Sequence, residues 1–347
     1  MSRFKLDYSI QDLQLSRPFT IARGTKEKVT NVFVRLSADG IEGFGEAAPN
    51  ARYSEDAAAV ADFLNSLPAR FFDNITSEDG LVRKLDEISP SVNAAKVATE
   101  MAWLDWRGKM LGISLWRQWQ APSATGPVTS YTIGLDTIEV MQQKVEAAAA
   151  YPIYKVKLGT DRDKEIITGI REVTDKPIRV DANEGWQTLE EAKDYIRFLA
   201  DHNIELIEQP MPAARFEDMI KLKDFSPLPL AADESFMGHE SLEEIARAFD
   251  VINIKLMKTG SLVKGHRIVQ QARDLGLEVM IGCMIESSLA NTAGAILSLW
   301  ADYADLDGHL LIKNDPVTGL ILDEEKRITV PDKPGLGVEV GEEIGWG

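Results

Sequence analysis

Three acidic residues follow consecutive apolar, β-rich runs of the sequence: Asp181, Glu208 and Asp233. They are roughly 26 residues apart, about the length of one strand plus one helix. If the runs are neighbouring parallel strands, the three carboxylates meet at one edge, where they repel one another unless a cation lies between them. Hard oxygen ligands favour Mg²⁺, with Mn²⁺ as the alternative. One acid after a strand is more simply a helix N-cap, but three in succession favour a metal site.

Lysines at the ends of two other runs could transfer protons. Lys155 and Lys157 are two residues apart, so on a strand their side chains point the same way. Lys255 ends a run four units later, which in a ring of eight strands is the opposite side. Two amines on opposite sides of one carbon could remove a proton from one face and return one to the other. A lysine after a strand can also be a solvated charge or a partner for a nearby acid, and we expect one of these two roles for Lys258.

Together these groups suit one type of chemistry. Removing a proton beside a carboxylate produces a dianionic enolate, which water stabilises poorly and a divalent cation stabilises well. The sequence therefore predicts an enzyme that takes a proton from the α-carbon of a carboxylate and puts one back.

Alternating strand-like and helix-like segments from about residue 127 are expected to position these groups. The strand-like runs are Val128–Ile133, Ile153–Leu158, Ile178–Asp181, Ile204–Glu208, Leu228–Asp233, Val251–Lys255, Glu278–Cys283 and a weaker one near Ala304–Leu306. Apolar strands alternating with helices indicate a parallel sheet covered on both faces, and this number of units favours a barrel. An open doubly wound sheet is the alternative, but no Gly-rich phosphate loop follows any run.

The two ends of the chain have a different pattern. Strand-like segments at Phe4–Leu15, Val29–Leu36 and Ile41–Ala47 are followed by helical segments up to about Met110. After about residue 310 the sequence is rich in proline and glycine, and we expect this tail to fold back against the N-terminal strands.

Composition limits the partners and the compartment. The formal net charge is −17, which disfavours binding to nucleic acids or anionic membrane surfaces. Cys283 is the single cysteine, so no intramolecular disulfide can form. With no signal-peptide pattern or long apolar stretch, we expect a cytoplasmic protein. A homo-oligomer is the default expectation.

The chain resembles the enolase superfamily, muconate-lactonizing-enzyme subgroup, over essentially its whole length. The resemblance rests on five motifs in order: Lys155-Val-Lys157, Arg179-Val-Asp181-Ala-Asn183, Ile207-Glu208-Gln209-Pro210, Ala232-Asp233-Glu234-Ser235 and Ile252-Asn253-Ile254-Lys255. It implies an α/β protein with a modified TIM barrel, (β/α)₇β, and an N-terminal α+β capping domain completed by the C-terminal tail. The expected parts are residues 1–126, 127–310 and 311–347.

The same resemblance assigns roles to residues. It implies that Lys157 and Lys255 are the bases, that Lys155 supports Lys157, and that the three acids bind Mg²⁺. Ser261 follows Gly260 where many relatives have a second glycine, a small change in a loop.

Asp305-Leu306-Asp307 at the end of the weak eighth strand is similar to the Asp-x-Asp motif of dipeptide epimerases, which receives the substrate's α-ammonium. It favours Mg²⁺-dependent epimerisation of a dipeptide such as L-Ala-L-Glu, by two-base 1,1-proton transfer through an enolate. A helix cap or surface turn is the simpler interpretation of these aspartates. The alternatives are an o-succinylbenzoate synthase or N-acylamino-acid racemase, whose substrates carry no ammonium, and a non-catalytic barrel that binds metal or anions.

The capping segments are expected to select the substrate. Arg23 belongs to the loop from Arg17 that covers the mouth in relatives, and it could pair with a substrate carboxylate or remain exposed. Tyr53 and Thr132 are further candidates for substrate contact. The remaining candidates, expected to support the site, are Asn183, Glu234 and Glu286.

Overall fold

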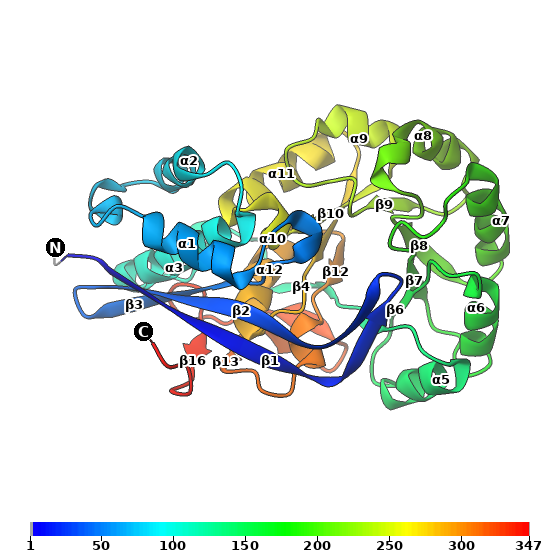
Figure 1. Ribbon diagram of the computed structural model, residues 1–347, viewed down its shortest axis with the longest axis horizontal. Helices are drawn as coiled ribbons and strands as arrows, with labels where there is room; N and C mark the ends of the chain where they lie inside the picture. Colours follow the sequence, from blue (N-terminus) through cyan, green and yellow to red (C-terminus); the bar gives the residue numbers. More distant parts are fainter. Residues whose placement is uncertain (1–2, 347) are drawn as a thin grey trace.

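The computed structural model describes residues 3–346 of the 347-residue chain, and its centre is a parallel barrel (Figure 1). Within these residues, eight strands form one sheet in sequence order, and every adjacent pair is parallel. They are β5 (Tyr131–Ile133), β6 (Tyr154–Lys157), β7 (Ile178–Asp181), β8 (Ile204–Glu208), β9 (Leu230–Ala232), β10 (Val251–Lys255), β11 (Glu278–Gly282) and β12 (Tyr303–Asp305). The predicted alternation of strands and helices is confirmed.

Backbone contacts next to β5 and β12 close the barrel. The N–H of Ser130 donates to the carbonyl of Ala304 at 3.2 Å, and Thr129 forms a parallel bridge with the same residue. This closure excludes the open doubly wound sheet. The first expected strand, Val128–Ile133, is instead two short strands, β4 (Thr125–Val128) and β5.

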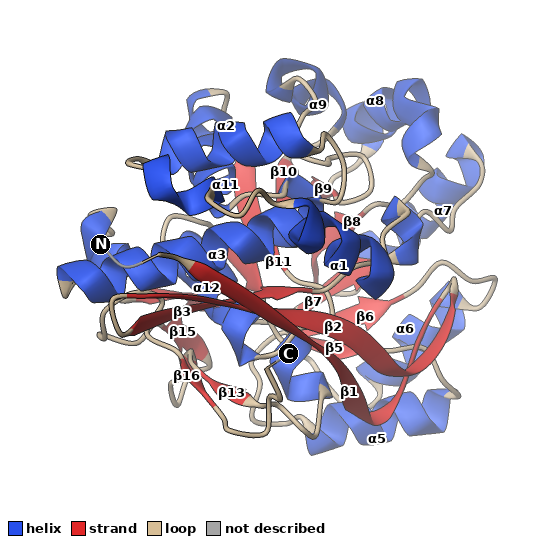
Figure 2. Ribbon diagram, turned by 60° about the vertical axis from the view of Figure 1, so that its left-hand side comes forward, coloured by secondary structure: helices blue, strands red, loops and turns tan. Residues whose placement is uncertain are grey.

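Helices surround the outside of the barrel, as Figures 1 and 2 show. They are α5 (Ile138–Ala147), α6 (Asp163–Arg171), α7 (Leu189–Ala200), α8 (Phe216–Phe225), α9 (Leu242–Ala248), α10 (Leu256–Thr259), α11 (Leu262–Asp274) and α12 (Ser288–Ser298), with the short 3₁₀ turns η3 (Ala213–Arg215) and η4 (Gly308–Leu311). Helix α7 begins with a capping box, in which the Thr188 side chain and Glu191 satisfy each other's backbone N–H groups.

Side-chain alternation explains why the barrel has an apolar interior and a polar mouth. A separate buried cluster is formed by Leu206, Ala231, Val251 and Met280, one residue from each of β8 to β11. Side chains two residues apart on a strand point the same way, so Glu208 and Asp233 lie on the same side as Leu206 and Ala231, nearer the carboxyl ends. The charged groups therefore face the barrel axis above a closed apolar layer.

The N-terminal segment forms a three-stranded antiparallel sheet: β1 (Lys5–Ile21), β2 (Gly24–Ala38) and β3 (Ile41–Ala47). The helices that follow are η1 (Ala51–Tyr53), α1 (Ala57–Ser66), η2 (Phe71–Asn74), α2 (Glu78–Ile88), α3 (Asn93–Leu111) and α4 (Leu115–Gln118). Helix α3 packs directly on β3, with no room for a side chain at two positions of the strand. A Cβ atom at Gly43 would lie 2.1 Å from the Ala102 carbonyl oxygen, and one at Gly45 would lie 1.9 Å from that of Ala98. These two glycines allow the helix to approach the sheet closely.

The β1–β2 hairpin is longer than the sequence pattern predicts. The expected strands end at Leu15 and begin at Val29, but pairing resumes after a bulge between Gln14 and Phe19 and continues to Ile21 and Gly24. The segment predicted to be a loop is therefore the far end of a hairpin. Its tip contacts the barrel, where the N–H of Leu135 donates to the carbonyl of Thr20 at 2.9 Å.

The C-terminal tail contains β13 (Val317–Thr318), β14 (Ile321–Leu322), β15 (Arg327–Thr329) and β16 (Glu339–Val340). It contacts the N-terminal part, since the N–H of Leu336 donates to Asp105 at 2.8 Å and the Trp346 ring lies 5.8 Å from that of Phe44. Between residues 3 and 346, no helix combines the length and the apolar character needed to cross a bilayer.

Candidate active site

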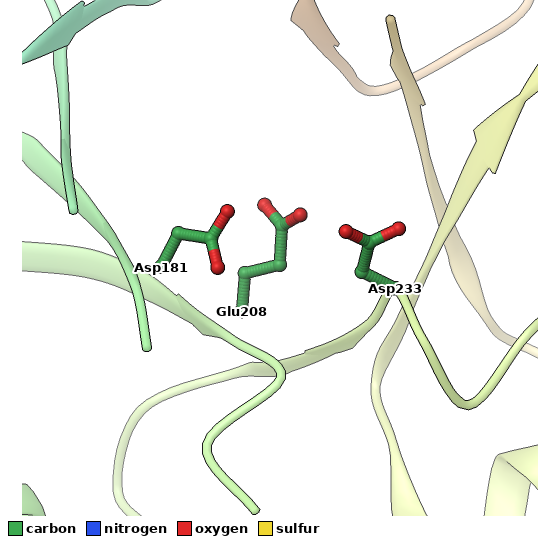
Figure 3. A group of neighbouring side chains, drawn as sticks. All are labelled: Asp181, Glu208 and Asp233. Atoms are coloured by element: carbon green, nitrogen blue, oxygen red, sulfur yellow. The ribbon is translucent and has the colours of Figure 1, made fainter. Parts of the chain in front are cut away.

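Asp181, Glu208 and Asp233 lie side by side at the carboxyl ends of β7 and β8 and directly after β9, and point to the same side of the strand ends (Figure 3). Each is buried and offers a carboxylate oxygen within 4.8 Å of those of the other two. Of the residues the structure describes, this is the one cluster of three or more possible metal-binding side chains. The sequence spacing therefore brings these acids together as predicted.

The burial and the pKa shifts of these three carboxyl groups suit a site that binds a cation. Burial raises the pKa of Glu208 to about 7, and the neighbouring Asp181 adds to this effect. Burial also acts to raise the pKa of Asp181 and Asp233, but nearby lysines hold both well below the usual range. Buried carboxylate oxygens at this separation are hard ligands, which suit Mg²⁺ or Mn²⁺.

Lys157 and Lys255 approach this cluster from different strands. The Lys157 ammonium lies 2.6 Å from Asp181, and the Lys255 ammonium lies 2.7 Å from Asp233. Strands β6 and β10, which end with these lysines, are separated by β7, β8 and β9 in the closed sheet. The two amines therefore come from opposite sides of the barrel.

Lys155 lies deeper than Lys157 and contacts three carboxylates. Its ammonium is 2.6 Å from Asp305, 2.7 Å from Glu208 and 3.2 Å from Asp181. Burial alone would lower the pKa of Lys155, but the carboxylates, led by Asp305, raise it well above its ordinary value. Lys155 is thus a fixed positive charge between the acid cluster and β12.

Lys258 is the partner of a nearby acid, which is the second of the two roles expected of it, and is not solvated. Lys258 is fully buried, and its ammonium donates to the carboxylate of Asp233 at 2.7 Å and to the carbonyls of Asp233 and Asn253. The one-turn helix α10, with Lys255 at its N-cap, turns the chain so that Lys258, three residues later, reaches the same carboxylate as Lys255. That spacing was the signal in the sequence.

Asp305 and Asp307 both line the cavity but have different partners. Asp305 accepts hydrogen bonds from Lys155 at 2.6 Å and from the Ser130 hydroxyl at 2.7 Å. Asp307 accepts one from the backbone N–H of Thr132 at 2.6 Å. Burial, with Asp305 nearby, raises the pKa of Asp307 to about 6. Of these two aspartates, only Asp307 has no lysine partner among the described residues.

Arg23, at the hairpin tip, contacts the barrel rather than projecting freely. Its guanidinium donates to the Asn183 carbonyl at 3.0 Å and lies 2.9 Å from Glu234 and 3.7 Å from Glu184. Arg52, in the second capping segment, lies 2.7 Å from the same Glu184. Glu184 thus contacts both capping segments, through Arg23 and Arg52, a role that the sequence did not predict.

The remaining predicted residues lie in or beside one cavity of about 530 Å³ between the barrel mouth and the capping segments. Tyr53, Thr132 and Asn183 line it, whereas Glu234 and Glu286 are buried next to it. Asn183 has a left-handed backbone, with φ of 45°, which turns the chain sharply after β7. Burial and the neighbouring Glu46 raise the pKa of Glu286 to about 8.

Two protein-family models match this chain, one over its N-terminal part and one over the barrel and the C-terminal tail. Residues 7–118 match the N-terminal domain of the mandelate racemase and muconate lactonizing enzyme family, and residues 138–344 match the enolase C-terminal domain-like family. L-Ala-D/L-Glu epimerase from Bacteroides thetaiotaomicron is 39% identical over 337 residues, covering 97% of this chain and 88% of that protein.

Solved structures of dipeptide epimerases are also similar to this chain over nearly its whole length. A substrate-liganded complex of L-Ala-D/L-Glu epimerase from Bacillus subtilis has a TM-score of 0.91 and 30% identity, with all of both chains covered. Dipeptide epimerase from Enterococcus faecalis, complexed with Mg and L-Leu-L-Tyr, has a TM-score of 0.87 and 30% identity, covering 98% of this chain and 100% of that one.

Proposed function

Because this chain belongs to the mandelate racemase and muconate lactonizing enzyme family of the enolase superfamily, we propose that it is a Mg²⁺-dependent dipeptide epimerase. It inverts the α-carbon next to the C-terminal carboxylate of a dipeptide such as L-Ala-L-Glu. The observation that carries this proposal is the pair Lys157 and Lys255, which reach one acid cluster from opposite sides of a closed barrel.

In the proposed mechanism, one lysine removes the α-proton and the other delivers a proton to the opposite face. Which lysine acts as the base depends on whether the substrate is the L or the D isomer at that carbon. Lys155 stays protonated between Asp305 and Glu208 and adds positive charge close to the reacting carboxylate. The capping hairpin covers the cavity and reduces the access of water to it.

Asp181, Glu208 and Asp233 are the residues proposed to hold Mg²⁺, which would supply the positive charge that stabilises the enolate and offsets the three carboxylates. Asp307 is proposed to receive the substrate's α-ammonium. Asp305 is proposed as the second carboxylate of this clamp, and it is held in place by Lys155 and Ser130.

Incubation in D₂O tests the proposal. Wild-type protein with Mg²⁺ and L-Ala-L-Glu should produce L-Ala-D-Glu that carries deuterium at the inverted carbon, detected by NMR or mass spectrometry. A non-catalytic barrel would give no exchange with any dipeptide. An o-succinylbenzoate synthase or N-acylamino-acid racemase would act on a substrate without an ammonium, and Asp307→Asn would affect it little.

The proposal also includes a cytoplasmic location, supported by the single cysteine, and a net charge of −17 that disfavours nucleic-acid and membrane partners. A homo-oligomer is proposed as the common state of such enzymes. The division at residues 126 and 310 is proposed from the change of pattern along the chain.

A further inference from the structure

Lys26 differs from the other cations of the cavity in having no carboxylate partner. Six lysines and arginines line the cavity among the described residues: Arg23, Lys26, Arg52, Lys155, Lys157 and Lys255. The other five each lie within 3 Å of a carboxylate oxygen, on Glu234, Glu184, Asp305, Asp181 or Asp233. In residues 3–346, no acid lies within ion-pair distance of Lys26.

The register of the β1–β2 hairpin explains why Lys26 faces the cavity. Phe19 pairs with Lys26 and Ile21 pairs with Gly24, so these side chains share one face of the two-stranded ribbon. All four residues line the cavity. Thr20 and Thr25 form the neighbouring pair, with hydroxyl groups 2.9 Å apart, and Thr25 also borders the cavity. At this place the cavity wall therefore carries the apolar side chains of Phe19 and Ile21 with the Lys26 ammonium beside them.

The surroundings of Lys26 favour an incoming anion. Partial desolvation, together with the like charge of the Arg23 guanidinium, lowers the pKa of Lys26. The charge of Arg23 is already balanced by Glu234, and its guanidinium also donates to the Asn183 carbonyl. A carboxylate entering the cavity would find Lys26 unpaired and every other cation already engaged.

We propose that Lys26 is a specificity-determining residue that binds the side-chain carboxylate of an acidic residue at the epimerised position. The inference rests on the proposed function and names its substrate class: dipeptides with glutamate or aspartate at the C-terminal position. Arg23, which sequence reasoning considered for this task, instead holds the hairpin tip on the barrel.

The test compares L-Ala-L-Glu with L-Ala-L-Gln, which has the same shape but no side-chain charge. In Lys26→Met, the ratio of kcat/KM for the glutamate substrate to that for the glutamine substrate should fall about tenfold or more, with the main change in KM. Lys26→Glu should lower the ratio further, because it places a like charge beside the substrate. Lys28→Met is the matched control, since Lys28 is on the same strand but is paired with Asp12 at 2.7 Å; its ratio should equal that of the wild type.

Two results would overturn the role of Lys26 alone. One is a wild-type protein that epimerises both dipeptides equally well. The other is a Lys26→Met variant in which both rates fall together and the ratio is unchanged, as a purely structural role would give. If wild-type protein exchanges the α-proton of neither dipeptide, the proposed function fails together with this inference.

Discussion

The strand ends of the barrel and the tip of the capping hairpin hold their charged groups in different ways. Asp181, Glu208 and Asp233 are buried, and each is fixed by a short parallel strand with neighbours on both sides. Arg23 and Lys26 are exposed on a two-stranded ribbon whose tip is held by a few polar contacts. The difference indicates that the fold fixes the reaction chemistry, whereas substrate choice depends on contacts that single substitutions can replace.

The largest expected effect on catalysis comes from a substitution at the strand ends of the barrel. Asp233→Asn should lower kcat by about 1,000-fold or more, because it removes one proposed metal ligand and the shared partner of Lys255 and Lys258. Affinity for Mn²⁺, followed by electron paramagnetic resonance, should fall in parallel. Asp194→Asn is a suitable control, since Asp194 is an exposed acid paired with Lys164. Normal metal affinity in the Asp233 variant would remove this residue from the proposed metal site.

Substitution of Asp307 is expected to have the next largest effect, on substrate binding. Asp307→Asn should raise KM for a dipeptide about 10- to 100-fold and change KM for an N-acyl amino acid much less, because only the dipeptide has an ammonium. Since the pKa of Asp307 is raised to about 6, the wild-type KM for a dipeptide should rise as the pH falls through 6 and this carboxylate is protonated. Equal changes for both substrates would argue against an ammonium site.

At the hairpin tip, Arg23→Met should have a smaller effect that does not depend on the substrate. Loss of the contacts with Glu234 and the Asn183 carbonyl should lower kcat/KM roughly tenfold for both L-Ala-L-Glu and L-Ala-L-Gln. The ratio between the two substrates should stay at the wild-type value. A selective loss with the glutamate substrate would instead make Arg23 a reader of the side chain.

The smallest effect on catalysis is expected at Glu100, away from both regions, where α3 meets the start of α11. Glu100 is fully buried, accepts a hydrogen bond from the N–H of Val263 at 2.8 Å, and has a pKa that burial raises to about 7. Because the folded pKa is above the unfolded value of about 4.3, its contribution to stability is full at low pH and is lost as the pH rises through 7.

Glu100→Gln should therefore weaken the fall in thermal stability between pH 6 and pH 8, by on the order of 1 kcal/mol. Melting temperatures of wild type and variant at the two pH values provide the measurement. Parallel pH profiles for the two proteins would show that Glu100 does not titrate in this range.

The strand ends could be predicted from the sequence because strand periodicity and the length of a βα unit place Asp181, Glu208, Asp233, Lys157 and Lys255 without knowledge of other contacts. The pairing of Lys155 with Asp305 could not, since the two residues are 150 positions apart and either could have faced the cavity alone.

The hairpin tip was harder to predict for the same reason. Arg23 is held by a carbonyl 160 residues away, and the pairing of Phe19 with Lys26 resumes only after a bulge that breaks the alternation. For Lys258, a solvated charge and a partner for an acid both stayed open, because the direction of its side chain is set by a single helical turn after β10. These features depend on tertiary contacts and not on local pattern.

The central claim is that Lys157 and Lys255 act on opposite faces of one carbon, and stereospecific exchange tests it most directly. Lys157→Ala and Lys255→Ala, each incubated in D₂O with L-Ala-L-Glu and separately with L-Ala-D-Glu, should both lose epimerisation. Each variant should still exchange the α-proton of one isomer, and the two variants should exchange opposite isomers. Exchange of the same isomer by both variants, or epimerisation at the wild-type rate by either, would contradict the two-base arrangement.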